Sequence, residues 1–524
     1  MMTMKNPFHI FATILVLLSA SCIKDLDTMP LNKDVFAGEQ AWQDTASYEK
    51  FLSKIYAGLA LSGNSGAFGA PDLSAADQGE ATFLRSYWNM QQLCTDEVVC
   101  SEDNESMRGL QFMQWNSTNH FISLNYTRIY LNIAYANEFL RETTDEKLSH
   151  RDLDEAMKTR IKGFRNEARA LRAMNYYFLM DLYANVPFID ETFPIGENKV
   201  EQKGREFFFQ WIESELRAVE GKLPPADKIH YGMVNDATVR MILSKMYLNS
   251  EIWVGKKMYD QCLTEIEKVI SENFSLDDRY AEIFCADNHL SPEIIFPIIY
   301  DGRRAATFGG TTYLIAASSK SDMNPTSTRG FSQAWSNIRA LEPLSDRFDA
   351  NDSRAMFWKE NRTRETDIWY DFTNGWSVVK YSNLNSDGTV GSNTSHADTD
   401  FPLFRLADAY LIYAEAVLRG AASGSRDKAI SYINALRDRA GADRITEIDL
   451  TLDFLLDERS RELYWEGHRR TDLIRFDRFT DNYNWPWKNG VHVGIMKVDD
   501  KFSIYPIPST EVTVNPYIIQ NAGY

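Results

Sequence analysis

Cysteine and histidine are scarce in this sequence, which limits the chemistry open to it. The 524 residues include 5 cysteines and 8 histidines, and the histidines are scattered, so we predict no metal site. Beyond Cys22, the remaining cysteines are too sparse for a disulfide framework. Cys94 and Cys100 are close enough to pair in an oxidising compartment, but their spacing matches no zinc motif. Buried or loop thiols are the favoured interpretation of Cys94, Cys100, Cys262 and Cys285.

Basic residues are also fewer than acidic residues. Lysine and arginine total 56 against 74 aspartates and glutamates, a net charge of −18. Such an acidic surface repels phosphate backbones, so we do not expect nucleic-acid binding. The 44% hydrophobic and 25% charged residues are typical of a soluble globular protein and exclude wholesale disorder. The aromatic content of 13% suits neutral, ring-shaped ligands.

Signatures of common catalytic and nucleotide sites are missing as well. The chain has no HExxH, GxSxG, Walker or GxGxxG pattern, and we expect no cofactor. Glu458, Glu462 and Glu466 fall on one helical face at steps of four, and a glycosidase needs two facing carboxylates. However, Arg459 and Arg461 interleave with them, which favours an ion-pair network between neighbouring helices.

A second pair of carboxylates, Asp77 and Glu80, stands beside Arg85 in a segment without helical periodicity. Hydroxyl recognition is as good an interpretation of this group as proton transfer. Nothing in the sequence requires catalysis.

Apolar runs long enough to cross a membrane are absent too. Ile10–Leu18 is apolar, but a spanning helix needs roughly twenty residues. The run follows Lys5 and leads through small residues to Cys22, a pattern similar to the lipobox of bacterial lipoproteins, whose cysteine is lipidated. Ser19 stands where most lipoboxes carry leucine, and plain secretion is the alternative. We predict a lipid-anchored protein that does not span the membrane.

Helical periodicity dominates what is present. Apolar residues recur at steps of three and four in several stretches, some of which form pairs that resemble tetratricopeptide units. This predicts a mainly all-α fold, with Trp42, Trp211 and Trp465 in the core. The predicted helices cover Trp42–Leu61, Arg128–Arg141, Phe164–Leu182, Ala237–Trp253, Met258–Ile270, Leu406–Arg419, Ala429–Ala440 and Leu452–Phe479.

Residues 285–400 are of a different kind, rich in glycine, asparagine, serine, threonine and aromatics, with a strand-like piece at Gly309–Leu314. Residues 70–120 are also irregular. Long loops on a rigid scaffold are where binding usually occurs. The predicted organisation is a signal peptide (1–21), a lipidated tether (22–45), a helical scaffold with binding loops (46–284), a loop-rich ligand-binding subdomain (285–400), and C-terminal helical units with an extended tail (401–524).

Six phrases, in order along nearly the whole chain, together resemble the SusD/RagB family of surface glycan-binding lipoproteins. The resemblance implies four tetratricopeptide-like helix pairs carrying a variable loop-rich face. It also implies a SusC-like TonB-dependent outer-membrane transporter as partner, and neither catalysis nor a redox cofactor. The phrases are RNEARALRAMNYYFLMDLYANVPF (165–188), VNDATVRMILSKMYL (234–248), FPLFRLADAYLIYAEAVLRG (401–420), AISYINALRDRAGA (429–442), LLDERSRELYWEGHRRTDLIRF (455–476) and YPIPSTEV…NP…QNAGY (505–524).

The resemblance also implies a glycan site made of an aromatic arc with polar side chains. Its polar members match Asp77 and Arg85, and two ring positions fall on Phe308 and Phe331. The third falls near Cys100 and Glu102, where no aromatic stands, which argues against a flat arc shaped for helical starch. Other aromatics that could rebuild a platform are Tyr87, Trp88, Trp115 and Trp335.

The sequence thus predicts a non-catalytic lipoprotein of the outer-membrane surface that binds an oligosaccharide or polysaccharide and passes it to the transporter. We expect the ligand on residues 72–115 and 300–340, where aromatics combine with Asp, Asn and Arg. Two alternatives stay open: a glycan-cleaving enzyme that uses Asp77 and Glu80 or the Glu458–Glu466 face, and a tetratricopeptide adaptor that binds peptides.

Overall fold

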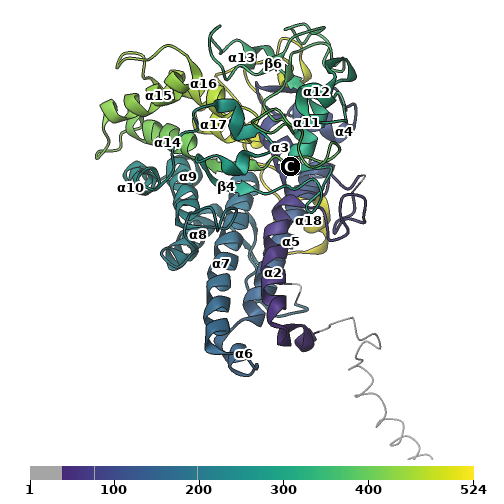
Figure 1. Cartoon of the computed structure of the whole chain (residues 1–524), viewed down its shortest axis with the longest axis vertical. Helices are drawn as coiled ribbons and strands as arrows, with labels where there is room; N and C mark the ends of the chain where they lie inside the picture. Colours follow the sequence, from purple (N-terminus) through teal and green to yellow (C-terminus); the bar gives the residue numbers. More distant parts are fainter. Residues whose placement is uncertain (1–37, 76, 198) are drawn as a thin grey trace, which may run out of the picture.

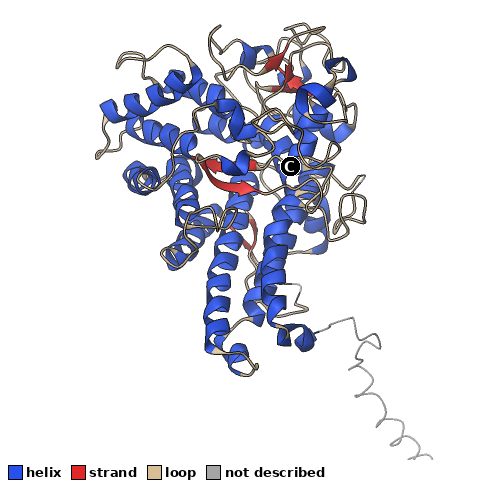
Figure 2. Cartoon of the chain, viewed as in Figure 1, coloured by secondary structure: helices blue, strands red, loops and turns tan. Residues whose placement is uncertain are grey.

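The computed structural model describes residues 38–75, 77–197 and 199–524 (Figure 1). Cys22, the predicted lipidation site, lies outside the described residues. Helices make up most of the ordered structure and the strands are few and short (Figure 2), so the predicted mainly helical fold is confirmed. Within the described ranges, no helix combines the length and the apolar character that crossing a membrane needs.

Eight long helices form the scaffold as four pairs. α2 packs on α5, α7 on α8, α9 on α10 and α14 on α15, and α5, α8 and α10 contact the first helix of the next pair. Polar N-cap side chains fix several starts: Asn235 accepts a hydrogen bond from the Thr238 amide, and Ser425 accepts one from the Lys428 amide. The bounds are α2 Thr45–Ala60, α5 His120–Glu142, α7 Glu155–Tyr183, α8 Arg205–Val219, α9 Asp236–Val254, α10 Tyr259–Ile270, α14 Leu406–Leu418 and α15 Arg426–Ala440.

Shorter helices occupy the connections, and α4, α11 and α12 gather at the end of the molecule opposite α6 (Figure 1). The other α-helices are α3 Phe83–Gln92, α4 Glu105–Gln111, α6 Asp145–Ser149, α11 Gly310–Ala317, α12 Pro325–Arg329, α13 Glu342–Ser345, α16 Leu452–Leu463, α17 Arg469–Arg475 and α18 Ser509–Val514. The 3-10 helices are η1 Gly38–Gln43, η2 Tyr280–Phe284, η3 Asn288–Leu290, η4 Ser321–Met323, η5 Lys488–Gly490 and η6 Asp500–Ser503.

The strands form two-stranded antiparallel sheets that tie distant segments together. The pairs are β1 (Val98–Cys100) with β5 (Ile338–Ala340), β2 (Val186–Pro187) with β3 (Gln202–Lys203), β4 (Ile294–Ile298) with β8 (Phe401–Arg405), and β6 (Phe357–Trp358) with β7 (Ser377–Val378). β1 and β5 bring the two segments predicted to bind ligand side by side, because the Ser101 amide continues their ladder to the Asn337 carbonyl (2.8 Å).

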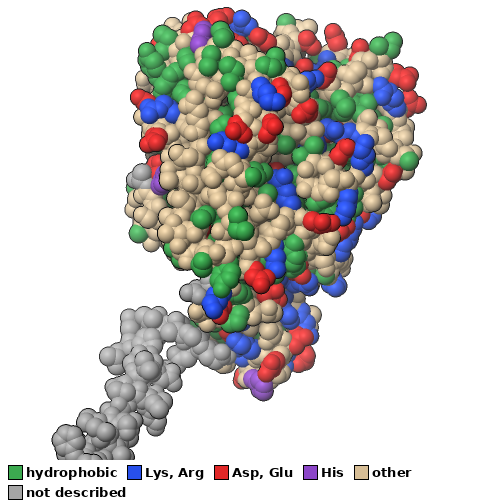
Figure 3. All heavy atoms as spheres, turned by 180° about the vertical axis from the view of Figure 1, so that it is seen from behind, with side chains coloured by type: hydrophobic (Ala, Val, Ile, Leu, Met, Phe, Trp, Pro, Cys, Tyr) green, Lys and Arg blue, Asp and Glu red, His purple; other side chains and the backbone are tan. Residues whose placement is uncertain are grey.

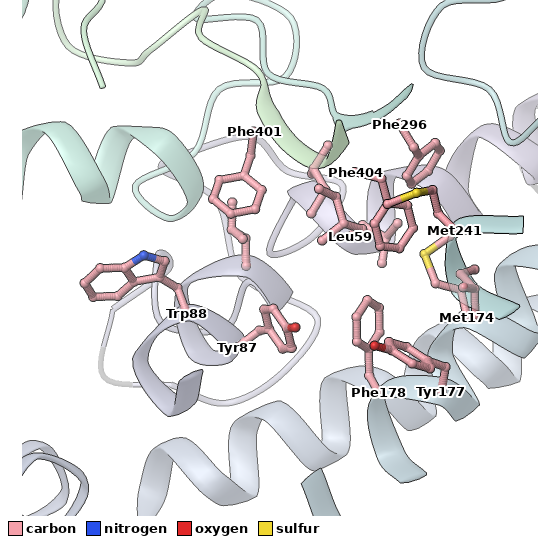
Figure 4. Close-up of a cluster of buried hydrophobic side chains, with 14 of the residues drawn as sticks. Leu59, Tyr87, Trp88, Met174, Tyr177, Phe178, Met241, Phe296, Phe401 and Phe404 are labelled. Atoms are coloured by element: carbon pink, nitrogen blue, oxygen red, sulfur yellow. The ribbon is translucent and has the colours of Figure 1, made fainter. Parts of the chain in front are cut away.

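One continuous core joins the scaffold to the loop-rich part. Phe178 of α7 and Met241 of α9 belong to the same buried cluster as Phe296 of β4 and Phe404 of β8 (Figure 4). The four cysteines of the described residues are free thiols, three buried and Cys285 partly exposed, as predicted from their scarcity. Trp42 and Trp465 are buried, and Trp211 is partly buried against the core.

The structure contradicts the strand predicted at Gly309–Leu314, where α11 lies instead. Every residue of α11 is buried, so its sequence lacks the contrast of apolar and polar positions that marks a surface helix. Gly310 has a positive φ, and a Cβ there would lie 2.2 Å from the Tyr300 ring. Gly310 therefore allows the backbone of α11 to approach the Tyr300 ring closely, and it does not form a turn between strands.

Three further boundaries differ from the sequence prediction. The single helix predicted over Leu452–Phe479 is two, α16 and α17, and Trp465 with φ of 67° lies between them rather than on a helical stripe. Residues 70–120 contain α3 and α4. The tail predicted as extended carries η6 and α18, and Tyr505 within it is buried, where its hydroxyl donates to the Met90 carbonyl (2.6 Å).

Candidate functional site

The candidate site begins with an ion pair between α3 and the segment before it. Arg85 of α3 is buried, and its Nη1 lies 3.2 Å from each carboxylate oxygen of Asp77, whose side chain is 47% exposed. The Tyr313 ring of α11 lies 4.6 Å from the guanidinium carbon, because α11 packs on α3. Arg85 is thus held from beneath, while the carboxylate it binds faces solvent.

Arg85 also has hydrogen-bonding capacity to spare. Its Nε is buried and has no partner among the described residues. Burial opposes the charge, but Asp77, Tyr313 and nearby carboxylates outweigh it, so the pKa of Arg85 lies above its ordinary value. The group is a permanent cation that holds the exposed Asp77 carboxylate, an arrangement suited to hydroxyl recognition at that carboxylate.

Two more carboxylates lie near this pair. Glu80 Oε2 is 3.3 Å from His120 Nε2. Glu102, just after β1, accepts hydrogen bonds from Asn104 Nδ2 (2.5 Å) and from Asn337 Nδ2 (3.0 Å). Burial raises the pKa of Glu102, with Arg85 acting in the opposite direction. Where the third ring was predicted, the structure therefore has a polar cluster formed by Glu102 with the amide side chains of Asn104 and Asn337.

Phe308 lies beside the ion pair and is half-buried. Its backbone passes so close to Gly79 that a Cβ there would be 2.6 Å from the Phe308 carbonyl and 3.0 Å from Asp77 Oδ1. Two further rings meet it: Phe68 at 5.1 Å and His396 at 4.8 Å between centroids. Neither ring was predicted, because Phe68 stands in a glycine-rich segment after the helix predicted at Trp42–Leu61 and His396 was one of the scattered histidines.

The structure contradicts the exposure expected for four predicted platform residues. Phe331 and Trp88 are 0% exposed, and Tyr87 and Trp115 are also buried. Trp88 Nε1 donates to the Trp465 carbonyl (2.9 Å), and both Tyr87 and Trp88 lie in the cluster of Figure 4. These rings are core residues, because aromatic area next to a large core is buried more often than it is displayed.

Trp115 has its own partners in the C-terminal tail. Its Nε1 donates to the Tyr524 hydroxyl (2.7 Å), and its ring packs on Phe502 and Tyr505. Trp335 is the remaining candidate of that group. It is half-buried, donates from Nε1 to Gln333 Oε1 (3.0 Å), and lies 6.3 Å from the Tyr313 ring that supports Arg85. Of the predicted site residues, Asp77, Phe308 and Trp335 thus present atoms at the surface, and the buried Arg85 holds the Asp77 carboxylate from beneath.

The carboxylates of α16 and the turn after it form the ion-pair network that the interleaved arginines predicted. Glu458, Glu462 and Glu466 are all buried. Glu458 accepts from Arg354 (2.8 Å), and Glu462 accepts from Arg405 (2.7 Å). Burial opposes ionisation of Glu458, but its arginines prevail and lower its pKa to about 2. The face of α16 offers a ligand neither access nor a protonated acid.

A separate groove of about 660 Å³ opens nearby, and no sequence pattern predicted it. Leu290, Ile299 and Val390 supply exposed apolar atoms at its rim. The carboxylates inside it are engaged with backbone amides: Asp398 accepts from Gly302 (2.7 Å), and Asp400 accepts from Tyr300 (2.8 Å). This groove is mainly an apolar hollow whose polar groups serve its own loops.

Two family models match the chain. Residues 300–524 match the model described as the SusD family, and residues 38–248 match one described as starch-binding and associating with the outer membrane. The chain is 32% identical to the starch-binding protein SusD of Bacteroides thetaiotaomicron, over 98% of each chain. It is 23% identical to a SusD-like protein of Bacteroides ovatus, over 80% of this chain and 76% of the relative.

Solved structures share the fold at lower sequence identity. A surface glycan-binding protein A of Bacteroides thetaiotaomicron, solved with laminarihexaose, superposes with a TM-score of 0.68 at 20% identity, covering 91% of this chain and 99% of that one. A SusD superfamily protein of Bacteroides vulgatus superposes with a TM-score of 0.71 at 16% identity, covering 92% and 99%. These matches extend across both the helical scaffold and the loop-rich part.

Proposed function

This chain belongs to the SusD family, and from that premise we propose that it is a non-catalytic protein of the outer-membrane surface that binds a neutral oligosaccharide or polysaccharide. Its full-length relative is a starch-binding protein, and one of its structural neighbours was solved with laminarihexaose. Both names support carbohydrate as the ligand class.

The observation that carries the proposal is the polar pair of Asp77 and Arg85 beside the half-buried Phe308. Sugar rings present apolar C–H faces that pack on aromatic rings, and their hydroxyls both donate and accept hydrogen bonds. Asp77 is an exposed acceptor, and the charged Arg85 holds it in place at 3.2 Å. The two kinds of contact that a sugar needs therefore adjoin.

The buried α16 carboxylates support a binding role rather than hydrolysis, because a glycosidase needs two accessible carboxyl groups of which one holds a proton. We further propose that Cys22 carries a lipid anchor and that the protein delivers its ligand to a SusC-like TonB-dependent transporter. Replacing Cys22 with alanine should release the protein from membranes in cells that lack the transporter.

Calorimetric titration with maltoheptaose and with laminarihexaose tests the proposal, with product analysis of the same mixtures. We expect saturable binding of at least one, no cleavage, and a loss of about 1.5–3 kcal/mol in Arg85→Ala, the range for hydrogen bonds of a charged group. Arg444→Ala is the matched control, since Arg444 forms an exposed pair with Asp438 (2.6 Å). Cleavage products, or binding of peptides and of neither glycan, would contradict the proposal.

A further inference from the structure

Phe68 is an exposed aromatic ring in a loop whose base is held by hydrogen bonds and an ion pair. It is 79% exposed, although a phenylalanine in water forgoes the free energy of burying its ring. The base of its loop is fixed, because the Asp72 amide donates to the Ser62 carbonyl (2.8 Å) and Lys54 Nζ lies 3.0 Å from Asp72 Oδ2. The loop therefore holds Phe68 out at its tip rather than burying it.

Phe68 packs against two other rings, the half-buried Phe308 and the buried His396. Its plane stands at 80° to Phe308, 5.1 Å away, and at 89° to His396, 5.7 Å away. Phe308 and His396 are themselves 4.8 Å apart. Together, Phe68, Phe308 and His396 form what we call the ring corner, in which two phenyl faces meet nearly at a right angle instead of lying along a flat arc.

His396 adds unused hydrogen-bonding capacity to the ring corner. It is 4% exposed, and neither ring nitrogen has a hydrogen-bond partner in the part of the chain that the structure describes. Burial lowers its pKa, so the imidazole is neutral and carries one donor and one acceptor. Leaving both unpaired in a buried place is costly, which indicates a partner that the protein itself does not supply.

The ring corner and the polar pair share one wall. A Cβ on Gly79 would lie 2.6 Å from the Phe308 carbonyl and 3.0 Å from Asp77 Oδ1, so the Phe308 backbone and the Asp77 carboxylate flank the same glycine. A ligand that lies on Phe308 can therefore reach the Asp77 carboxylate. A sugar residue fits this arrangement, since it has both an apolar ring face and hydroxyls around its edge.

We propose that the ring corner holds one sugar residue of the bound glycan, with Phe68 replacing the aromatic ring absent near Glu102 and His396 binding a hydroxyl. This inference rests on the proposed glycan-binding function. Because the two phenyl faces are nearly perpendicular, they grip a single residue, at a chain end or a bend, and do not stack along several residues of a helical glycan.

Titration of maltoheptaose and laminarihexaose into Phe68 variants tests the inference. Phe68→Ala should weaken binding of whichever probe the wild type binds by about tenfold, and Phe68→Tyr should restore it, because the ring face is what matters. Ile448→Ala is the control, since Ile448 is equally displayed but lies far along the chain, before α16.

The histidine is tested in the same titrations. His396→Phe keeps the ring and removes the nitrogens, so it should weaken binding by roughly fivefold. His396→Gln, which keeps a donor and an acceptor, should weaken it less. Thermal unfolding of each variant checks that the fold is intact.

Two outcomes would overturn the inference in distinguishable ways. If Arg85→Ala weakens binding but Phe68→Ala does not, the glycan site stands and the ring corner is not part of it. If the wild type binds neither probe, the proposed function and the ring corner fail together. Affinity that rises steadily from maltotriose to maltoheptaose would also contradict a site that grips one residue.

Discussion

Two regions of this protein pair arginines with carboxylates, and they do so in opposite ways. In the α16 network, Glu462 accepts from Arg354 (3.1 Å), Arg405 (2.7 Å) and Arg439, and none of these side chains is more than 4% exposed. At the candidate site, Arg85 meets one half-exposed carboxylate and keeps a nitrogen unpaired among the described residues. Both regions leave one arginine Nε without a partner among the described residues, on Arg439 in the network and on Arg85 at the site, but only the site has a carboxylate that faces solvent.

Pairs of arginine and carboxylate that stabilise the fold can be told from pairs that bind a ligand by how their charges are partnered and exposed. A buried charge whose partners are all present stabilises the fold and specifies its packing, and removing one partner leaves others uncompensated. A buried donor without a partner, next to an exposed ring, costs free energy unless something binds. The surface itself gives no such hint: acidic and basic side chains are interspersed over the face shown in Figure 3 rather than gathered in one patch.

The largest expected effect follows from breaking the network. Glu458→Ala leaves Arg354, Arg437 and Arg461 without a shared carboxylate, so the free energy of unfolding should fall by about 3–5 kcal/mol. The affinity of the folded variant for glycan should change less than twofold. Denaturant unfolding measures the free energy of unfolding, and calorimetry measures the glycan affinity. A loss of affinity with unchanged stability would show that α16 takes part in binding.

The stability that the same network contributes should depend on pH. Since the pKa of Glu458 is lowered to about 2 in the folded protein from an unfolded value near 4.5, the folded state binds fewer protons in that window. The stability it contributes is complete above about pH 5 and is lost as the pH falls toward 2. The gap in unfolding free energy between wild type and Glu458→Gln should therefore narrow over pH 5 to 2, and a constant gap would contradict the charge pairing.

A smaller effect is expected in the aromatic core beside the site. Trp88→Phe removes the hydrogen bond to the Trp465 carbonyl and part of a fully buried ring, so unfolding free energy should fall by about 2 kcal/mol. Glycan affinity should stay within twofold, because no atom of this side chain reaches the surface. A large loss of affinity in a stable Trp88→Phe protein would show that the ring becomes exposed when ligand binds.

Sequence reasoning predicted the helices better than the site. α9 has a polar cap at Asn235 and α10 has an apolar stripe, which are local signals, and the arginines between Glu458 and Glu466 predicted the ion-pair network. Exposure of an aromatic ring is not a local property. Phe331 and Phe308 stand in similar glycine-rich stretches, yet the first is buried and the second lies at the surface.

The ring corner was beyond prediction for the same reason. Phe68, Phe308 and His396 are separated by more than two hundred and by nearly ninety residues, and only the folded chain brings them together. The break between α16 and α17 was missed because Trp465, with its positive φ, is a residue type that rarely takes that conformation. Tertiary packing decides such cases, and a single sequence does not record it.

The most direct measurement compares the two phenylalanines that the family pattern assigned to one aromatic arc. Leucine keeps most of the apolar volume of phenylalanine but lacks the flat ring face. In calorimetric titration with the glycan probe that binds the wild type, Phe308→Leu should lose about 1 kcal/mol of binding free energy, because its half-exposed ring meets the sugar. Phe331→Leu should bind as the wild type does, because that ring is wholly buried. Equal affinity of Phe308→Leu and wild type, or a loss confined to Phe331→Leu, would contradict the account.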